Sequence, residues 1–285
     1  MGVRVGMSML LWGPRVTEEH DAVLEEIAEA GYDGVEVPIT GVPGAELEAL
    51  GRRLDALGLA RTAVGFCTEE VDPASPDPAV RSAAIEHLVE LARGAEALGA
   101  DLVGGPIHSA YAHFPDRAPG AEDFQRAAEV LHAAAERAGG VTLGVEFLNR
   151  FEAWLLSCTS QTVELLDAVD HPRVRAVFDT HHAHIEEDST AEALARMGRH
   201  LGHLQVSENH RGVLGAGQVP FDAVFDAAAR LRYDGWVVVE SFSREDPAFG
   251  NGLRIWRSLS PSPMLVAREG LQLVRAQLAR VGLLS

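Results

Sequence analysis

The stretch VTLGVEF, residues 141–147, is an apolar run that ends beside an acidic residue. Three later stretches repeat this layout, namely RVRAVFD at 173–179, GHLQVS at 202–207 and GWVVVE at 235–240. The polar residues at the ends of the four runs are Glu146, Asp179, Gln205 and Glu240. They lie 33, 26 and 35 positions apart, which is close to the length of one strand followed by one helix. The pattern predicts parallel strands, each with a polar residue at its end.

The rest of the chain continues this alternation of strand-like and helical segments. Eight apolar runs have strand character, at residues 3–9, 34–38, 60–65, 102–105, 142–147, 174–178, 202–207 and 235–240. Amphipathic stretches such as TEEHDAVLEEIAEAG (17–31) separate them, and the last helix, at 263–282, follows an irregular stretch at 241–263. We therefore expect an α/β fold, a (β/α)8 TIM barrel forming a single domain over residues 1–285. A doubly wound open sheet is the alternative, but the first turn, SMLLWGP, lacks its Gly-rich phosphate fingerprint.

In such a barrel the carboxyl ends of all strands meet at one mouth, so these polar side chains converge there. Three carboxylates at one place repel each other unless a cation holds them. We therefore predict a divalent-metal site formed by Glu146, Asp179, Gln205 and Glu240, and an enzyme active site around it. The alternative is that Gln205 only packs, and that a water molecule or His203 supplies the fourth ligand.

The charge and the cysteine content exclude other classes of protein. The chain has 42 acidic and 24 basic residues, a net charge of −18, which disfavours nucleic acid and anionic membranes as partners. No apolar run approaches the ~18 residues of a membrane helix, and MGVRVGMSMLLWG lacks the layout of a cleavable signal. The two cysteines, Cys67 and Cys158, do not make a disulfide framework, so we expect reduced thiols, a buried Cys67 and a cytoplasmic protein.

Further polar residues follow the predicted strand ends. Glu152 comes six residues after a strand-end carboxylate and is expected either to reach a substrate hydroxyl or to be a solvated loop charge. The segment FDTHHAHIEE places His181, His182 and His184 directly after a strand, and we expect one of them to hydrogen-bond the substrate or to hold a ligand in place, and at least one to be structural. Arg211 lies on the loop after the seventh strand, where a guanidinium holds a substrate oxygen.

Two residues near other strand ends are candidates for the wall of a sugar pocket. Trp12 in MLLWG follows the first predicted strand, and His108 in GGPIHSAYAHF follows the fourth. Packing in the core is the alternative for Trp12. The glycines of GVLGAG, at 212–217, indicate a tight loop over the site, and a phosphate cradle there is a weaker interpretation because P-loop spacing is missing.

Taken together, EFLNRFE, DTHHAHIEE, GHLQVSENHRGVLGAG and VVVESFSR resemble the sugar phosphate isomerase/epimerase superfamily, the xylose isomerase-like TIM barrels, and within it the D-tagatose and D-psicose 3-epimerases. The resemblance covers nearly the whole chain, including RIWRSLS, and its motifs are specific as a set. It implies one Mn²⁺, Mg²⁺ or Co²⁺ bound by Glu, Asp, His and Glu. Glu146, Asp179 and Glu240 match three of these ligands, while Gln205 stands at the histidine position, as in hydroxypyruvate isomerases.

The same resemblance implies roles for the site residues. Glu146 and Glu240 would be the acid/base pair, and Glu152, His182 and Arg211 would hold the substrate. The implied activity is that of a ketose 3-epimerase or aldose–ketose isomerase working through an enediolate, in a homodimer or homotetramer. A hydroxypyruvate isomerase-like enzyme, or a lyase or hydrolase of 3-keto-glycosides, is the alternative. The acidic charge argues against the AP endonucleases that share the fold.

Overall fold

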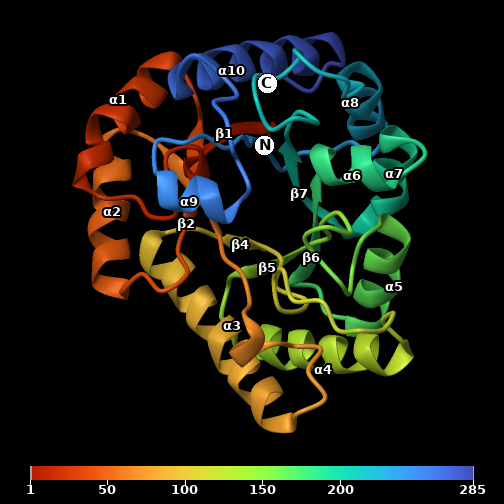
Figure 1. Ribbon diagram of the computed structural model, residues 1–285. Coiled ribbons are helices and arrows are strands. Elements are labelled where there is room, and N and C mark those ends of the chain that lie inside the picture. Colours follow the sequence, from red (N-terminus) through yellow and green to blue (C-terminus); the bar gives the residue numbers. More distant parts are fainter. Residues whose placement is uncertain (1, 285) are drawn as a thin grey trace.

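Eight parallel strands close into a barrel in the order in which they occur along the chain, with β1 pairing with β8 (Figure 1). The computed structural model describes residues 2–284. The strands are β1 (Arg4–Ser8), β2 (Gly34–Pro38), β3 (Ala60–Val64), β4 (Leu102–Gly105), β5 (Thr142–Glu146), β6 (Val174–Asp179), β7 (Leu201–Val206) and β8 (Trp236–Val239). The predicted (β/α)8 TIM barrel is thus confirmed.

Helices connect the strands and form the outer ring of the barrel (Figure 1). The α-helices are α1 (Asp21–Ala30), α2 (Gly44–Ala56), α3 (Pro78–Leu98), α4 (Ala121–Arg137), α5 (Thr159–Val169), α6 (Thr180–Glu186), α7 (Thr190–Met197), α8 (Phe221–Arg230), α9 (Pro247–Gly252) and α10 (Pro263–Arg280). Short 3-10 turns are η1 (Met9–Leu11), η2 (Glu18–His20), η3 (Glu69–Val71) and η4 (Gly198–His200).

The boundaries of α3 illustrate how the sequence sets these elements. Asp77 accepts a hydrogen bond from the backbone nitrogen of Ala79 (2.8 Å), and Pro78 occupies the first helical turn, where its missing N–H costs nothing. The helix ends at Gly99, whose φ of 83° is a left-handed conformation that glycine adopts without strain. Between these ends, residues such as Leu88 and Leu91 are buried on one face of the helix.

The predicted strands at 34–38 and 102–105 coincide with β2 and β4, and the other six differ from the observed strands by one residue at one or both ends. The stretch at 241–263, expected to be irregular, contains the helix α9. Asp246 caps this helix by accepting hydrogen bonds from the nitrogens of Ala248 (2.9 Å) and Phe249 (3.0 Å). This short helix lacks the long amphipathic repeat that revealed the other helices.

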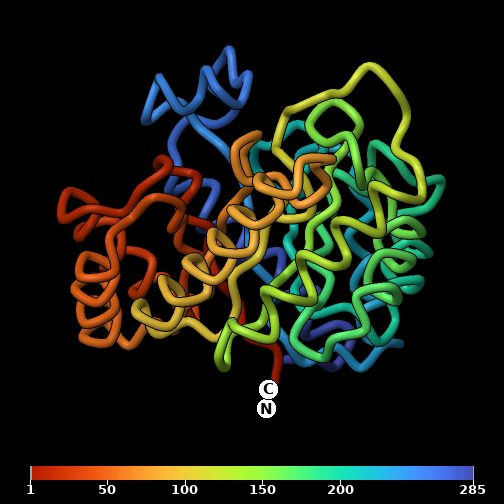
Figure 2. Tube along the Cα trace, turned by 90° about the horizontal axis from the view of Figure 1, so that it is seen from below, coloured from red at the N-terminus to blue at the C-terminus, as the bar shows by residue number. Residues whose placement is uncertain are grey.

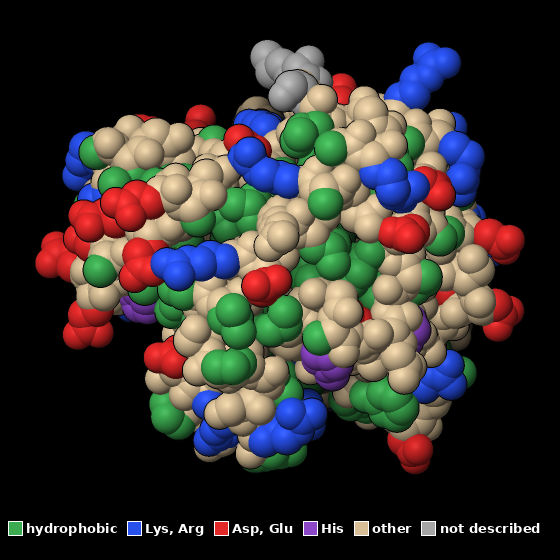
Figure 3. All heavy atoms as spheres, turned by 90° about the horizontal axis from the view of Figure 1, so that it is seen from above, with side chains coloured by type: hydrophobic (Ala, Val, Ile, Leu, Met, Phe, Trp, Pro, Cys, Tyr) green, Lys and Arg blue, Asp and Glu red, His purple; other side chains and the backbone are tan. Residues whose placement is uncertain are grey.

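Seen from the side, the barrel has two distinct ends (Figure 2). The first and last described residues lie together at one end, and the segment containing α9 projects from the opposite end (Figure 2). On the face drawn in Figure 3, acidic and basic side chains of the described residues are interspersed. Among residues 2–284, no helix combines the length and apolar character needed to span a lipid bilayer.

Gly34, the first residue of β2, is a position where the backbones approach too closely for a side chain. An added Cβ would lie 2.1 Å from the carbonyl oxygen of Ala60 and 2.7 Å from the ring of Trp236. We expect Gly34→Ala to lower the free energy of unfolding by at least about 1–3 kcal/mol, the usual range for overpacking. The measurement is urea denaturation. The matched control is Gly44→Ala at the start of α2, where an added Cβ meets nothing within 4 Å. Equal midpoints for both variants would contradict the expectation.

Candidate active site

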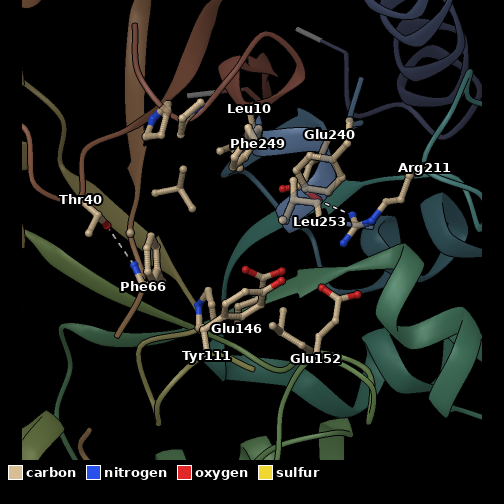
Figure 4. A pocket seen from close by; sticks show the side chains of 18 of the residues that line it. Leu10, Thr40, Phe66, Tyr111, Glu146, Glu152, Arg211, Glu240, Phe249 and Leu253 are labelled. Atoms are coloured by element: carbon tan, nitrogen blue, oxygen red, sulfur yellow. Dashed lines mark hydrogen bonds and ion pairs between the residues drawn. The ribbon is translucent and has the colours of Figure 1, made fainter. Parts of the chain in front are cut away.

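A cavity of about 470 Å³ opens where the strands end, and α9 forms part of its wall (Figure 4). Its wall carries three carboxylates, an imidazole and a guanidinium, from Glu146, Glu152, Glu240, His182 and Arg211. Much of the remaining wall is apolar, formed by residues such as Leu10, Pro14, Val64, Phe66, Phe249 and Leu253. In Figure 4, Phe66 lies across the cavity from Glu152 and Arg211, whereas Phe249 and Leu253 are drawn close to Glu240. The cavity therefore suits a molecule with one strongly polar end.

Three carboxylates converge at the polar side, as the sequence predicts. Glu146 and Asp179 are the last residues of β5 and β6, and Glu240 follows β8 directly. All three side chains are almost completely buried. Burial raises the pKa of Glu146 well above its ordinary value, and the negative charges of Glu240 and Asp179 raise it further. Burial also raises the pKa of Glu240 and of Asp179, although Arg211 opposes both shifts.

Arg211 supplies positive charge within this cluster. Its Nη1 donates to Asp179 Oδ2 (2.7 Å) and to Ser207 Oγ (2.9 Å), and it also pairs with Glu240. Burial disfavours the guanidinium charge, but Asp179 and Glu240 outweigh it and raise the pKa of Arg211. The sequence analysis placed Arg211 on a substrate oxygen, whereas the structure places Nη1 on the carboxylates. Three ionised carboxylates and one guanidinium leave two negative charges, which is the charge that a divalent cation balances.

The hydrogen bonds of His182 determine which of its nitrogens carries the proton. The backbone N–H of Asn149 donates to Nδ1 (3.0 Å), so in the neutral ring the proton is on Nε2. Burial is the main cause that lowers the pKa of His182, and the charge of Arg211 adds to it, so the neutral ring is favoured. Nε2 lies 3.5 Å from Asp179 Oδ2 and 3.6 Å from Glu146 Oε1.

This tautomer makes His182 a hydrogen-bond donor toward the cavity. Glu146, Asp179 and His182 have ligand atoms within 4.8 Å of one another, but a metal would need the Nε2 lone pair that the proton occupies. Nε2 also lies 3.0 Å from Arg211 Nη2, another donor. Both donors need an acceptor, and a substrate oxygen in the cavity would provide one.

Gln205 provides a further oxygen next to the carboxylates. It pairs with Asp179 in the register of β6 and β7, and only 1% of its surface is exposed. Its Nε2 donates to Glu36 Oε1 (2.9 Å), whereas its own Oε1 is buried and has no hydrogen-bond partner among the described residues. A buried amide oxygen left without a partner is costly. Carboxylates and an amide oxygen are ligands of the kind that Mg²⁺ and Mn²⁺ prefer, so the donor set fits one such cation.

The remaining predicted site residues differ in whether they line the cavity. Glu152 lines the cavity, half-buried, and accepts a hydrogen bond from Asn149 Nδ2 (2.7 Å). Trp12 packs in the hydrophobic core instead of lining the cavity, because the turn η1 places Leu10 on the wall in its stead. His108 is also off the cavity wall and fully buried, and burial lowers its pKa to about 3. In the structure both residues are buried and neither lines the cavity; for Trp12 this agrees with the packing alternative. Cys67 is fully buried, as expected.

Glu208, which the sequence analysis missed, holds the loop that carries Arg211. Its buried carboxylate accepts hydrogen bonds from the backbone nitrogens of Gly215, Gln218 and Val219, each 3.0 Å long. These are nitrogens that a phosphate cradle would need free, so the structure argues against that interpretation of the glycine-rich loop. Nothing in the pattern SENHRG distinguishes this glutamate from a solvated one, because its partners are backbone groups up to 11 residues away.

Fold and site together define a (β/α)8 barrel with an acidic pocket at the carboxyl ends of its strands, which is where enzymes of this fold have their active sites. Comparison with known proteins agrees with this class. The chain belongs to the xylose isomerase-like TIM barrel family, whose model matches residues 24–276.

Individual members of the family are similar over nearly their whole length. L-ribulose 3-epimerase of Mesorhizobium japonicum is 30% identical over 271 residues, which are 93% of this chain and 91% of the relative. Ketose 3-epimerase of Arthrobacter globiformis is 31% identical over 262 residues, 90% of each chain. The crystal structure of D-psicose 3-epimerase with D-tagatose, from Clostridium cellulolyticum H10, has a TM-score of 0.89 and 28% identity, covering 97% of this chain and 99% of that one.

We expect Glu208→Gln to loosen the loop that carries Arg211. A glutamine has one acceptor oxygen and brings two N–H donors, which would face backbone donors that the carboxylate now satisfies. The free energy of unfolding should fall by about 1.5–3 kcal/mol, the range for hydrogen bonds to a charged group. Urea denaturation measures this, and limited proteolysis should locate new cleavage within residues 209–219. The matched control is Glu90→Gln, at an exposed position of α3. A variant as stable and as protease-resistant as this control would show that Glu208 does not hold the loop.

Proposed function

We propose that this protein is a divalent-metal-dependent isomerase of ketoses, either a ketose 3-epimerase or an aldose–ketose isomerase. The observation that carries the proposal is the pair Glu146 and Glu240, two buried glutamates on the cavity wall whose pKa values are both raised. A carboxyl group whose pKa is raised holds a proton more readily than an exposed carboxyl group, which suits it to general acid or base catalysis. The three relatives described above are named as sugar 3-epimerases, and their names support the same chemistry.

In the proposed reaction, one glutamate removes the proton from the carbon next to the ketose carbonyl, and the other returns a proton. The electrons of the broken C–H bond move toward the carbonyl oxygen, and the N–H donors of His182 and Arg211 stabilise the negative charge that develops there. Return of the proton to the opposite face of the same carbon gives the epimer. Its return to the adjacent carbon gives the isomer. Glu152 holds a hydroxyl group of the substrate.

The metal of this proposal is held by Glu146, Asp179, Gln205 and Glu240, and we infer that it is Mn²⁺ or Mg²⁺, with Co²⁺ as a substitute. When bound, it polarises the carbonyl as a Lewis acid. The buried carboxylate and amide oxygens of this cluster support these ligands, since Gln205 Oε1 has no other partner among residues 2–284. Assembly into a homodimer or homotetramer, and residence in the cytoplasm, stay predictions from the sequence.

A second candidate is an enzyme that applies the same enolising chemistry to 3-keto-glycosides. The observation that favours it is the apolar side of the cavity, where residues such as Phe66 and Phe249 would pack against an apolar substituent on the sugar. Incubation in D₂O with Mn²⁺ and a panel of ketoses, hydroxypyruvate and keto-glycosides distinguishes the candidates, because only true substrates incorporate deuterium. Deuterium uptake by keto-glycosides and not by free ketoses would favour this second candidate.

We expect Glu146→Gln and Glu240→Gln each to lower kcat for the ketose substrate by at least about 10²-fold, the lower end of acid/base contributions. Treatment of the wild type with EDTA should abolish turnover, and Mn²⁺ should restore it. Steady-state kinetics and solvent-deuterium exchange measure the loss. Because both glutamates are also proposed ligands, the metal content of each variant is measured in parallel. If either metal-loaded variant exchanged substrate hydrogen at the wild-type rate, that glutamate would not belong to the acid/base pair. Full activity of the metal-free protein would show that the reaction does not need the metal.

We expect Gln205→His to change which metal the protein prefers. The substitution keeps the ligand neutral but replaces an amide oxygen with an imidazole nitrogen, which raises relative affinity for Co²⁺ and Zn²⁺. Wild type should favour Mn²⁺ or Mg²⁺, and the variant should shift toward Co²⁺ or Zn²⁺. Competition titrations against a chelator of known affinity give the two preference series. If the two series were identical, Gln205 would not be a ligand, and the packing alternative would hold.

A further inference from the structure

Glu36 on β2 is a fully buried carboxylate inside the barrel, and it contacts two side chains of β7. Its Oε1 accepts the hydrogen bond from Gln205 Nε2 (2.9 Å), and its Oε2 lies 2.8 Å from His203 Nε2. Strands β2 and β7 are not neighbours, because β1 and β8 lie between them. The three side chains therefore meet across the barrel interior, beneath the cavity.

The chemistry of these groups fixes the orientation of the Gln205 amide. An ionised carboxylate only accepts hydrogen bonds, so the amide has to present its NH₂ group to Glu36 and its oxygen to the opposite side. His203 occupies the other carboxylate oxygen, which leaves Oε1 for Gln205. The amide oxygen then has no partner among residues 2–284, and Gln205 itself is paired with Asp179 in the register of β6 and β7, so both side chains leave the sheet on the same face.

We propose that Glu36 is a positioning residue of the metal site: by accepting Gln205 Nε2, it fixes the amide so that Oε1 faces the carboxylates as the fourth ligand. This proposal rests on the metal-dependent function proposed above. Without Glu36 the amide could rotate by half a turn and turn its NH₂ group toward the cation. The NH₂ group of an amide has no lone pair with which to bind a metal. Glu36 acts through Gln205 and does not itself touch the substrate or the cavity wall.

The test is a double-mutant cycle on Mn²⁺ affinity, measured by titration of metal-free protein with Mn²⁺ in competition with a chelator. We expect Glu36→Gln to weaken Mn²⁺ binding by about 10–100-fold, the usual effect of losing a group that orients a ligand. In the background of Gln205→Met, which has no amide to orient, Glu36→Gln should cause no further weakening. Equal losses in both backgrounds would mean that Glu36 acts only by its charge and would overturn the proposal, as would an unchanged affinity of Glu36→Gln.

Asp123→Asn is the matched control for general destabilisation. Asp123 is likewise a buried carboxylate with charged partners, Arg117 and Arg126, but these contacts lie on α4 and the loop before it. The variant should lower Tm and leave Mn²⁺ affinity unchanged. A loss of Mn²⁺ affinity in Asp123→Asn as large as in Glu36→Gln would attribute the effect to destabilisation and overturn the proposal.

A measurement on the wild type keeps the proposal testable if Glu36→Gln does not fold. In protein labelled with ¹⁵N-glutamine and saturated with diamagnetic Mg²⁺, the side-chain NH₂ of Gln205 should exchange slowly with solvent, because it donates to a buried carboxylate. Its resonance is assigned by its absence from Gln205→Met. Free exchange would overturn the proposal. If the wild type bound no Mn²⁺, both the proposed function and the role of Glu36 would be wrong. If it bound Mn²⁺ but did not convert ketoses, only the proposed function would be wrong, and the double-mutant cycle would still test the role of Glu36.

Discussion

The guanidinium of Arg211 lies against Asp179 and Glu240, and its charge allows three carboxylates to share a buried barrel mouth. Removing charged groups from water is expensive, and like charges at close range add to that cost. One guanidinium offsets only part of it, so the pKa values of all three carboxyl groups stay raised. This incomplete balance leaves the cluster short of positive charge, which agrees with the binding of one further cation proposed above.

The position of Arg211 depends in turn on a loop that has no regular structure. Arg211 has a φ of 60°, an uncommon conformation for a residue with a side chain, and its carbonyl oxygen accepts a hydrogen bond from Ser241 Oγ (2.5 Å). Glu208 fixes the rest of the loop through backbone N–H groups. Such strain persists only where the surroundings enforce it, and here those surroundings hold the positive charge against its partners.

The sequence predicted the barrel and the meeting of Glu146, Asp179 and Glu240, because apolar runs mark parallel strands and parallel strands end at one edge. It did not predict Glu36, since GVEVP reads as an ordinary strand and its partners lie across the barrel on β7. For Trp12 the sequence left two interpretations open, a pocket residue or packing in the core, and the structure shows packing. Contacts across the barrel interior, such as those of Glu36 with β7, depend on how the sheet closes in three dimensions. The spacing of residues along the chain does not encode this closure.

Glu36 also bears on why this position of the barrel tolerates glutamine in place of the histidine that the resemblance implies. A primary amide has a donor side and an acceptor side, and a neutral imidazole likewise has one N–H and one lone pair. A carboxylate beneath the site engages the donor side of either group and leaves the lone pair facing the mouth. On this view, position 205 requires a side chain with a hydrogen-bond donor on one side and a lone pair on the other, and both glutamine and histidine meet this requirement. If Gln205 holds the metal as proposed, an oxygen or a nitrogen at this position would change which metal is preferred without changing the charge of the site.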